Sequence, residues 1–134
     1  MKDLELMEAA YKAREMSYSP YSGFSVGAAL LCTDGTVYLG CNIENATYTP
    51  TNCAERTAFF KAVSEGKRSF SAIAITGGRH GETSPLCAPC GVCRQVMAEF
   101  CDRDFKILLG TKEDIRTYSL NDILPFAFTV ESMK

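Results

Sequence analysis

Two short segments of the chain carry the residues that could do chemistry. One reads Cys53-Ala54-Glu55-Arg56, and the other reads Pro89-Cys90-Gly91-Val92-Cys93-Arg94-Gln95. Cys90 and Cys93 are three residues apart, so their thiolates can converge on one ion when the segment is helical. Each segment lies where we expect a helix to begin, and a helix N-terminus stabilises a thiolate. With Cys53 as a third sulfur, the set suits zinc and leaves one tetrahedral position open for water, as a catalytic zinc requires.

An acidic residue accompanies the first cysteine. Glu55 lies two residues beyond Cys53, so both side chains can reach one site only if that site lies off the end of the helix. A carboxylate placed there would lie near a zinc-bound water without being a ligand, and could accept and return its proton. We also expect Arg56 and Arg94 to donate hydrogen bonds to the sulfurs and to offset the negative charge of three thiolates.

A further cysteine leaves two other metal sites open. Cys87 extends the second segment to C-x-x-C-x-x-C, which is typical of the start of an iron–sulfur run, although Val96-Met97 stands where the next cysteine and proline would follow. A closed structural zinc site that adds Cys87 to the other three cysteines is the second alternative, and it would make the protein a binding module. His80, the only histidine, is interpreted as a solvated loop residue rather than a ligand.

Hydrophobic periodicity and turn residues predict the elements that must position these side chains. We expect helices at about 3–16, 53–65, 91–100 and 120–124, strands at 26–32, 37–41, 72–76, 105–109 and 115–118, and a loop at 77–88. Asp34-Gly35 indicates a hairpin between the first two strands. Helices between the later strands imply parallel crossovers, but residues 110–114 are too short for one, so the last strand should pair antiparallel. The predicted fold is an α/β three-layer α/β/α sandwich with a mixed five-stranded sheet, in which the third and fourth strands are parallel.

Length and charge limit the possible partners. The 134 residues suit a single domain, 1–134. The net charge is −2 and no Lys/Arg-rich stretch occurs, which argues against a nucleic-acid partner and favours a small neutral substrate. The N-terminus lacks the apolar core of a signal peptide and no apolar run approaches transmembrane length, so we expect a cytoplasmic protein with no membrane partner. In a reducing compartment, cysteine clusters more often bind metal or serve catalysis than form disulfides.

The chemical segments resemble a known family. Cys-Ala-Glu followed by Pro-Cys-x-x-Cys resembles the zinc deaminase signature in its three-cysteine form. Three further segments are similar to the small homotetrameric cytidine deaminases, so that the resemblance runs from about residue 10 to residue 128: PYSGFSVGAA at 20–29, GCNIENA at 40–46 and PFAF at 125–128. The resemblance implies the cytidine-deaminase-like fold and the hydrolysis of free cytidine and deoxycytidine to uridine, deoxyuridine and ammonia in pyrimidine salvage.

The resemblance also implies how the reaction proceeds. One zinc ion per subunit would be held by Cys53, Cys90 and Cys93. A zinc-bound hydroxide would attack C4 of the pyrimidine ring. Glu55 would act as the proton shuttle, first from water to ring N3 and then to the departing amine.

Substrate contacts follow from the same resemblance. Phe24 would pack against the pyrimidine ring, and Asn42 and Glu44 would bind the ribose 3′-hydroxyl. The backbone of Ala54, together with Glu55, would read the ring edge.

The resemblance further implies a homotetramer with active sites at the subunit interfaces. Tyr48 and Phe128 match the family positions that lie over a neighbouring subunit's site. Two rival activities remain. A polynucleotide deaminase would need a basic groove and a helix between the last strands, and a deaminase of a cytosine-containing antibiotic would have less use for the ribose-binding pattern of Asn42 and Glu44.

Overall fold

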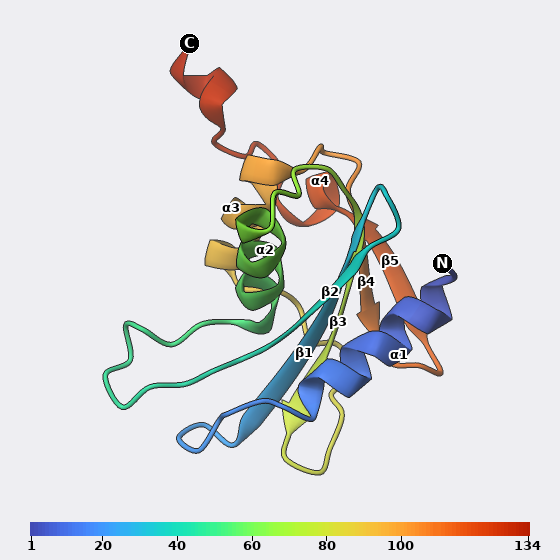
Figure 1. The fold of residues 1–134 in the computed structure, drawn as a ribbon, viewed down its shortest axis with the longest axis vertical. Coiled ribbons are helices and arrows are strands. Elements are labelled where there is room, and N and C mark those ends of the chain that lie inside the picture. The colour runs from blue at the N-terminus through green and yellow to red at the C-terminus, as the bar shows by residue number, and fades with distance from the viewer.

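A five-stranded sheet separates one helix from two others in the computed structural model, which describes all 134 residues (Figure 1). The helices are α1 (Asp3–Arg14), α2 (Ala54–Ser64), α3 (Gly91–Phe100) and α4 (Leu120–Ile123), and a short 3-10 helix, η1, spans Val130–Met133. The strands are β1 (Phe24–Cys32), β2 (Val37–Cys41), β3 (Phe70–Arg79), β4 (Lys106–Gly110) and β5 (Ile115–Ser119). No helix in the fold combines the length and apolar character that crossing a bilayer needs.

The sheet has the strand order β2-β1-β3-β4-β5. Strands β3 and β4 pair in parallel, whereas all other neighbours pair antiparallel. The predicted hairpin, the predicted parallel pair and the antiparallel last strand are therefore confirmed. Because β2 and β3 both run opposite to β1, they run in the same direction as each other. The helices that follow them, α2 and α3, consequently begin near the same edge of the sheet.

Both faces of the sheet are buried, and β3 shows the alternation most clearly. Ala72 and Ala74 pack beneath α1 in a cluster of alanine, leucine and methionine side chains. Ile73 and Ile75 point to the other face, where they join a larger cluster around Phe59 of α2. Successive side chains of a strand face opposite sides, so this one strand divides the core into two layers. The predicted three-layer sandwich is confirmed.

Two glycines allow the helices to lie directly on the sheet. A Cβ atom at Gly27 of β1 would stand 2.1 Å from the carbonyl oxygen of Ala10 in α1, and one at Gly40 of β2 would stand 2.3 Å from the carbonyl oxygen of Ala54 in α2. No side chain fits such a gap, because real Cβ contacts are far longer. Gly40 therefore sets how closely the first turn of α2 approaches the sheet.

Several predicted boundaries are wrong. Helix α1 ends at Arg14 rather than at residue 16, β1 begins two residues early at Phe24, and η1 was not predicted. The largest error is in β3, which continues through residues 77–79 of the predicted loop. These residues pair with the start of β1, from Phe24↔Arg79 to Val26↔Gly77. A partner more than 50 residues away supplies the hydrogen bonds, so the local Gly-rich composition gave no indication of the strand.

We expect Gly40→Ala to lower the free energy of unfolding by about 3 kcal/mol, because the added methyl group must push α2 away from β2. Urea unfolding measures the loss. Gly91→Ala is the matched control: nothing lies within 4 Å of its Cβ position, so its stability should stay within about 0.5 kcal/mol of wild type. Equal stability of Gly40→Ala and wild type would contradict the close docking of α2.

Candidate active site

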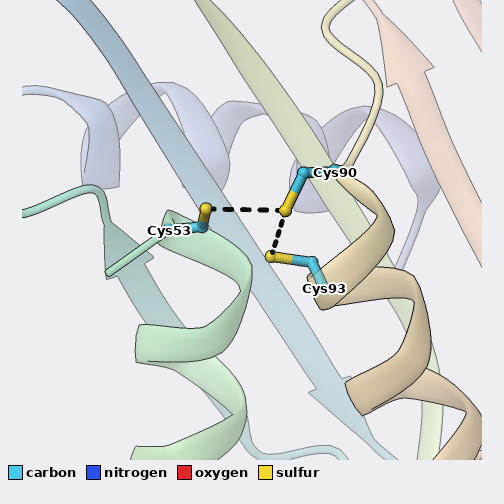
Figure 2. A group of neighbouring side chains, drawn as sticks. All are labelled: Cys53, Cys90 and Cys93. Atoms are coloured by element: carbon cyan, nitrogen blue, oxygen red, sulfur yellow. Dashed lines mark hydrogen bonds between the residues drawn. The ribbon is translucent and has the colours of Figure 1, made fainter. Parts of the chain in front are cut away.

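Three sulfur atoms meet between the starts of α2 and α3 (Figure 2). Cys53 is the N-cap of α2, Cys90 is the N-cap of α3, and Cys93 lies in the first turn of α3. The Sγ atoms of Cys53 and Cys90 are 3.8 Å apart, and those of Cys90 and Cys93 are 3.5 Å apart. Tetrahedral zinc with Zn–S bonds of about 2.3 Å needs sulfurs about 3.8 Å apart. The three donors therefore fit a zinc ion in both chemistry and spacing.

The electrostatics of this cluster favour a thiolate. The pKa of Cys53 is lowered to about 5 because Cys93 donates a hydrogen bond to its sulfur and the Arg56 guanidinium lies beside it. The pKa of Cys93 is raised in turn, because its proton is held by Cys53. Cys93 is buried, whereas Cys90 is exposed, so the cluster is open on one side. A site that already stabilises negative sulfur and remains accessible is suited to a dication with an open position.

The two arginines behave differently. Arg56 Nη2 donates to Cys53 Sγ at 3.3 Å, and Arg56 Nε is buried without a hydrogen-bond partner. The expectation for Arg94 is wrong: its Nε donates to the carbonyl of Pro89 at 2.8 Å, and its Nη1 donates to the carbonyl of Ile123 at 2.6 Å. Adjacent residues of a helix do not share a face, so Arg94 points away from Cys93 and ties α3 to α4 instead.

Glu55 is the one buried carboxylate of the chain, with 4% of its surface exposed. Its pKa is raised to about 7, chiefly by burial and less by the charge on Cys53, against a backbone hydrogen bond that lowers it. A bound dication would lower the pKa again. A carboxyl group that titrates close to neutral pH is suited to both accepting and donating a proton.

A pocket of about 200 Å³ opens beside these groups. Four predicted substrate or catalytic residues line it, together with two of the sulfurs: Phe24, Asn42, Ala54, Glu55, Cys53 and Cys90. Larger cavities elsewhere contain none of these sulfurs, so chemistry rather than size identifies the site. Val26 also lines the pocket and was missed, although it lies two residues after Phe24 and hence on the same face of β1. No motif indicated Thr51, Asn52 or Ala88, which also line the pocket together with Cys87.

Three predicted substrate residues do not line this pocket. Glu44 accepts hydrogen bonds from the backbone N–H groups of Tyr21 and Ser22, at 3.0 and 3.1 Å. Glu44 and Tyr48 line a neighbouring cavity instead, and Tyr48 is 79% exposed. Phe128 is 62% exposed on the C-terminal segment, where its carbonyl accepts from Gln95 Nε2 at 2.7 Å. Within one chain, Tyr48 and Phe128 therefore do not reach the pocket beside Glu55.

Cys87 lies outside the sulfur cluster. The group of potential metal ligands contains Cys53, Cys90 and Cys93, but not Cys87. Its Sγ packs over β3, within 2.8 Å of where a Cβ at Gly77 would stand. Burial raises its pKa to about 11, so it remains a thiol. The arrangement favours the open three-cysteine site over the closed four-cysteine and iron–sulfur alternatives.

Comparisons with known proteins agree with this geometry. The family profile described as "Cytidine and deoxycytidylate deaminase zinc-binding region" matches residues 1–109. A cytidine deaminase from Sporosarcina psychrophila is 53% identical over 130 residues, which are 96% of this chain and 93% of that protein. One from Halalkalibacterium halodurans is 54% identical over 129 residues, covering 96% and 95%. The crystal structure of a cytidine deaminase from Burkholderia pseudomallei superposes with a TM-score of 0.87 at 50% identity, covering 96% of this chain and 100% of that one.

We expect Cys87→Ser to keep one zinc per chain, because its sulfur is not in the cluster. Cys53→Ser should bind zinc about tenfold more weakly or worse, since losing a ligand costs at least as much as losing a group that orients one. Elemental analysis of the purified variants after dialysis against a weak chelator measures both. Loss of zinc from Cys87→Ser would restore the closed four-cysteine site.

Proposed function

The chain belongs to the cytidine and deoxycytidylate deaminase family, and from that premise we propose that the pocket beside Glu55 is its active site. The enzyme hydrolyses cytidine to uridine and ammonia with the help of zinc. Deoxycytidine is proposed as a second substrate. The observation that carries the assignment of the site is the meeting of three cysteine sulfurs with a buried carboxyl group at one small pocket.

Cys53, Cys90 and Cys93 would hold the zinc ion, which supplies Lewis-acid activation of water when bound. The chain's part is to keep three negatively charged sulfurs together. The two helix N-termini contribute their partial positive charge. Arg56 adds a full charge at 3.3 Å from Cys53. Without these groups the thiolates would repel one another, and the cluster would bind a proton more readily than a metal.

Glu55 would move the protons. It accepts a proton from the attacking water and donates it to ring N3, which makes C4 electrophilic. It then takes the proton of the new C4 hydroxyl and donates it to the exocyclic amine, as the C4–N bond breaks, the C4 carbonyl forms and ammonia leaves. Burial supports this role, because it excludes bulk water and raises the carboxyl pKa, to about 7 before a metal binds.

The nucleoside would be held by groups around the pocket. Phe24 offers a ring face to the pyrimidine, and the Ala54 backbone lies beside Glu55 at the ring edge. Asn42 and Glu44 would bind the ribose 3′-hydroxyl. The Asn42 amide supports this, because Nδ2 donates to the Phe24 carbonyl at 2.8 Å and keeps a second N–H for a ligand.

A homotetramer would complete each site with Tyr48 and Phe128 from neighbouring subunits. The C-terminal segment supports this, since it extends away from the rest of the fold (Figure 1). Its exposed apolar side chains include Phe126, Phe128 and Met133. Several such residues on one short segment are typical of an interface between proteins. We also propose that the enzyme acts in pyrimidine salvage in the cytoplasm, where thiolate ligands stay reduced.

A side-by-side assay of cytidine, deoxycytidine, cytosine, dCMP and single-stranded DNA tests the function. We expect turnover of the two nucleosides, because the pocket accepts one ring and a sugar rather than a polymer. Glu55→Gln serves as the control: it should retain zinc and bind cytidine, but turn over about a thousandfold more slowly, since two proton transfers lose their carrier. Conversion of DNA but not of cytidine, or a Gln variant close to wild-type activity, would overturn the proposal.

Sedimentation velocity tests the assembly. Wild-type protein should sediment as a tetramer.

Phe128→Ala should raise the KM for cytidine severalfold in a steady-state assay, because an aromatic contact contributes roughly 1 kcal/mol. A fully active monomer would contradict the shared active site.

A further inference from the structure

A row of four polar side chains joins the loop after β3 to Asn42. His80 Nε2 lies 2.9 Å from Ser19 Oγ, and Ser19 Oγ lies 3.2 Å from Ser17 Oγ. Ser17 Oγ in turn hydrogen-bonds Asn42 Oδ1. Ser19 is only 3% exposed, so water cannot readily replace its partners. The row brings together the loop after α1, the end of β2 and the loop after β3.

The direction of each hydrogen bond in this row follows from the donors available. Asn42 Oδ1 accepts from the backbone N–H of Val26 at 2.9 Å, which identifies that atom as the oxygen. Ser17 must therefore donate its hydroxyl proton to Asn42 and can accept from Ser19. Because Ser19 donates its only proton to Ser17, its oxygen can only accept a hydrogen bond from the His80 ring. A hydroxyl has one proton to give, so His80 must carry a proton on Nε2.

This direction fixes the amide of Asn42. Its Oδ1 is occupied by two donors, and its Nδ2 already donates once, to the Phe24 carbonyl. The remaining Nδ2 proton belongs to whatever oxygen enters the pocket that Asn42 lines. We propose that His80 is a positioning residue for the substrate sugar: through Ser19 and Ser17 it holds the Asn42 amide in the orientation that donates to a ribose hydroxyl. The inference rests on the ribose-binding role proposed for Asn42 above.

The loop that carries His80 is itself held in place. The backbone N–H of His80 donates to the carbonyl of Gly23 at 2.9 Å. Arg14, at the end of α1, donates to the carbonyl of Arg79 at 3.1 Å and to the hydroxyl of Thr83 at 3.0 Å. His80 is thus exposed, as a solvated loop residue would be, but its ring is a fixed donor.

Kinetics on two substrates test the positioning role. His80→Ala should raise the KM for cytidine roughly fivefold, the value of one hydrogen bond, and leave kcat unchanged, because no group near Glu55 is altered. The KM for 2′,3′-dideoxycytidine, which lacks the 2′- and 3′-hydroxyls of the ribose, should not change. His80→Gln, whose side-chain amide can donate in place of Nε2–H, should restore much of the cytidine KM. Glu82→Ala in the same loop is the matched control, because the Glu82 side chain makes no hydrogen bond or ion pair.

The Asn42→Ala variant separates the two proposals. If it leaves the preference for cytidine over dideoxycytidine intact, Asn42 does not bind the sugar, and the ribose-binding proposal and the positioning role fall together. If it removes the preference while His80→Ala leaves the preference unchanged, the positioning role alone is overturned. In the expected case, adding His80→Ala to Asn42→Ala changes nothing further, since the effect of His80 passes through Asn42.

A measurement on the wild-type protein does not depend on any variant folding. His80 is the only histidine, so labelling with ¹⁵N-histidine gives NMR signals from one ring. We expect the ring to be protonated on Nε2. A neutral ring protonated on Nδ1 alone would overturn the row of hydrogen bonds.

Discussion

The three sulfurs that would bind zinc must lie close together as thiolates, which repel one another, and the fold holds them beside a buried carboxylate. The sulfurs would move away from one another if the backbone were free. The repulsion between two like charges about 4 Å apart costs several kcal/mol at a partly buried site. Two helix N-termini and Arg56 offset this repulsion. The same arrangement keeps Glu55 out of water, so its pKa moves toward neutrality. Metal binding and proton transfer therefore depend on one local balance of charge.

The sheet determines where the three sulfurs and Glu55 come together. Strand β1 pairs antiparallel with both β2 and β3, which makes β2 and β3 run in the same direction. The chain leaves both strands at one edge, and α2 and α3 begin there. Gly40 lets α2 lie directly on β2, so the first turn that carries Glu55 is held by backbone packing rather than by long side chains.

The side of the pocket that we propose to bind the sugar is built differently. Here loops from three parts of the chain are joined by hydrogen bonds among short side chains, with Ser17, Ser19 and Asn42 in one row and Glu44 bound to the backbone of residues 21 and 22. Serine and asparagine have few rotatable bonds, so ordering them costs little entropy. Arg14 joins the loop after β3 to the start of β1. The residues proposed for chemistry lie at helix ends, and those proposed for sugar recognition lie in this loop network.

The sequence alone predicted the candidate metal ligands and the carboxylate. Spacing within a segment is local, so Cys90 and Cys93 must share one helix turn and Glu55 must follow Cys53, whereas the meeting of the two segments depends on the fold. It also determined the layers of the fold, since periodicity and the short link at 110–114 are local too. It did not determine that residues 77–79 form a strand, that Arg94 binds carbonyls instead of sulfur, that Cys87 packs on β3, or that His80 reaches Ser19. Each of these depends on a partner supplied by another part of the chain. Only the packed tertiary structure decides which donor meets which acceptor, because burial makes an unmatched polar group too costly to leave.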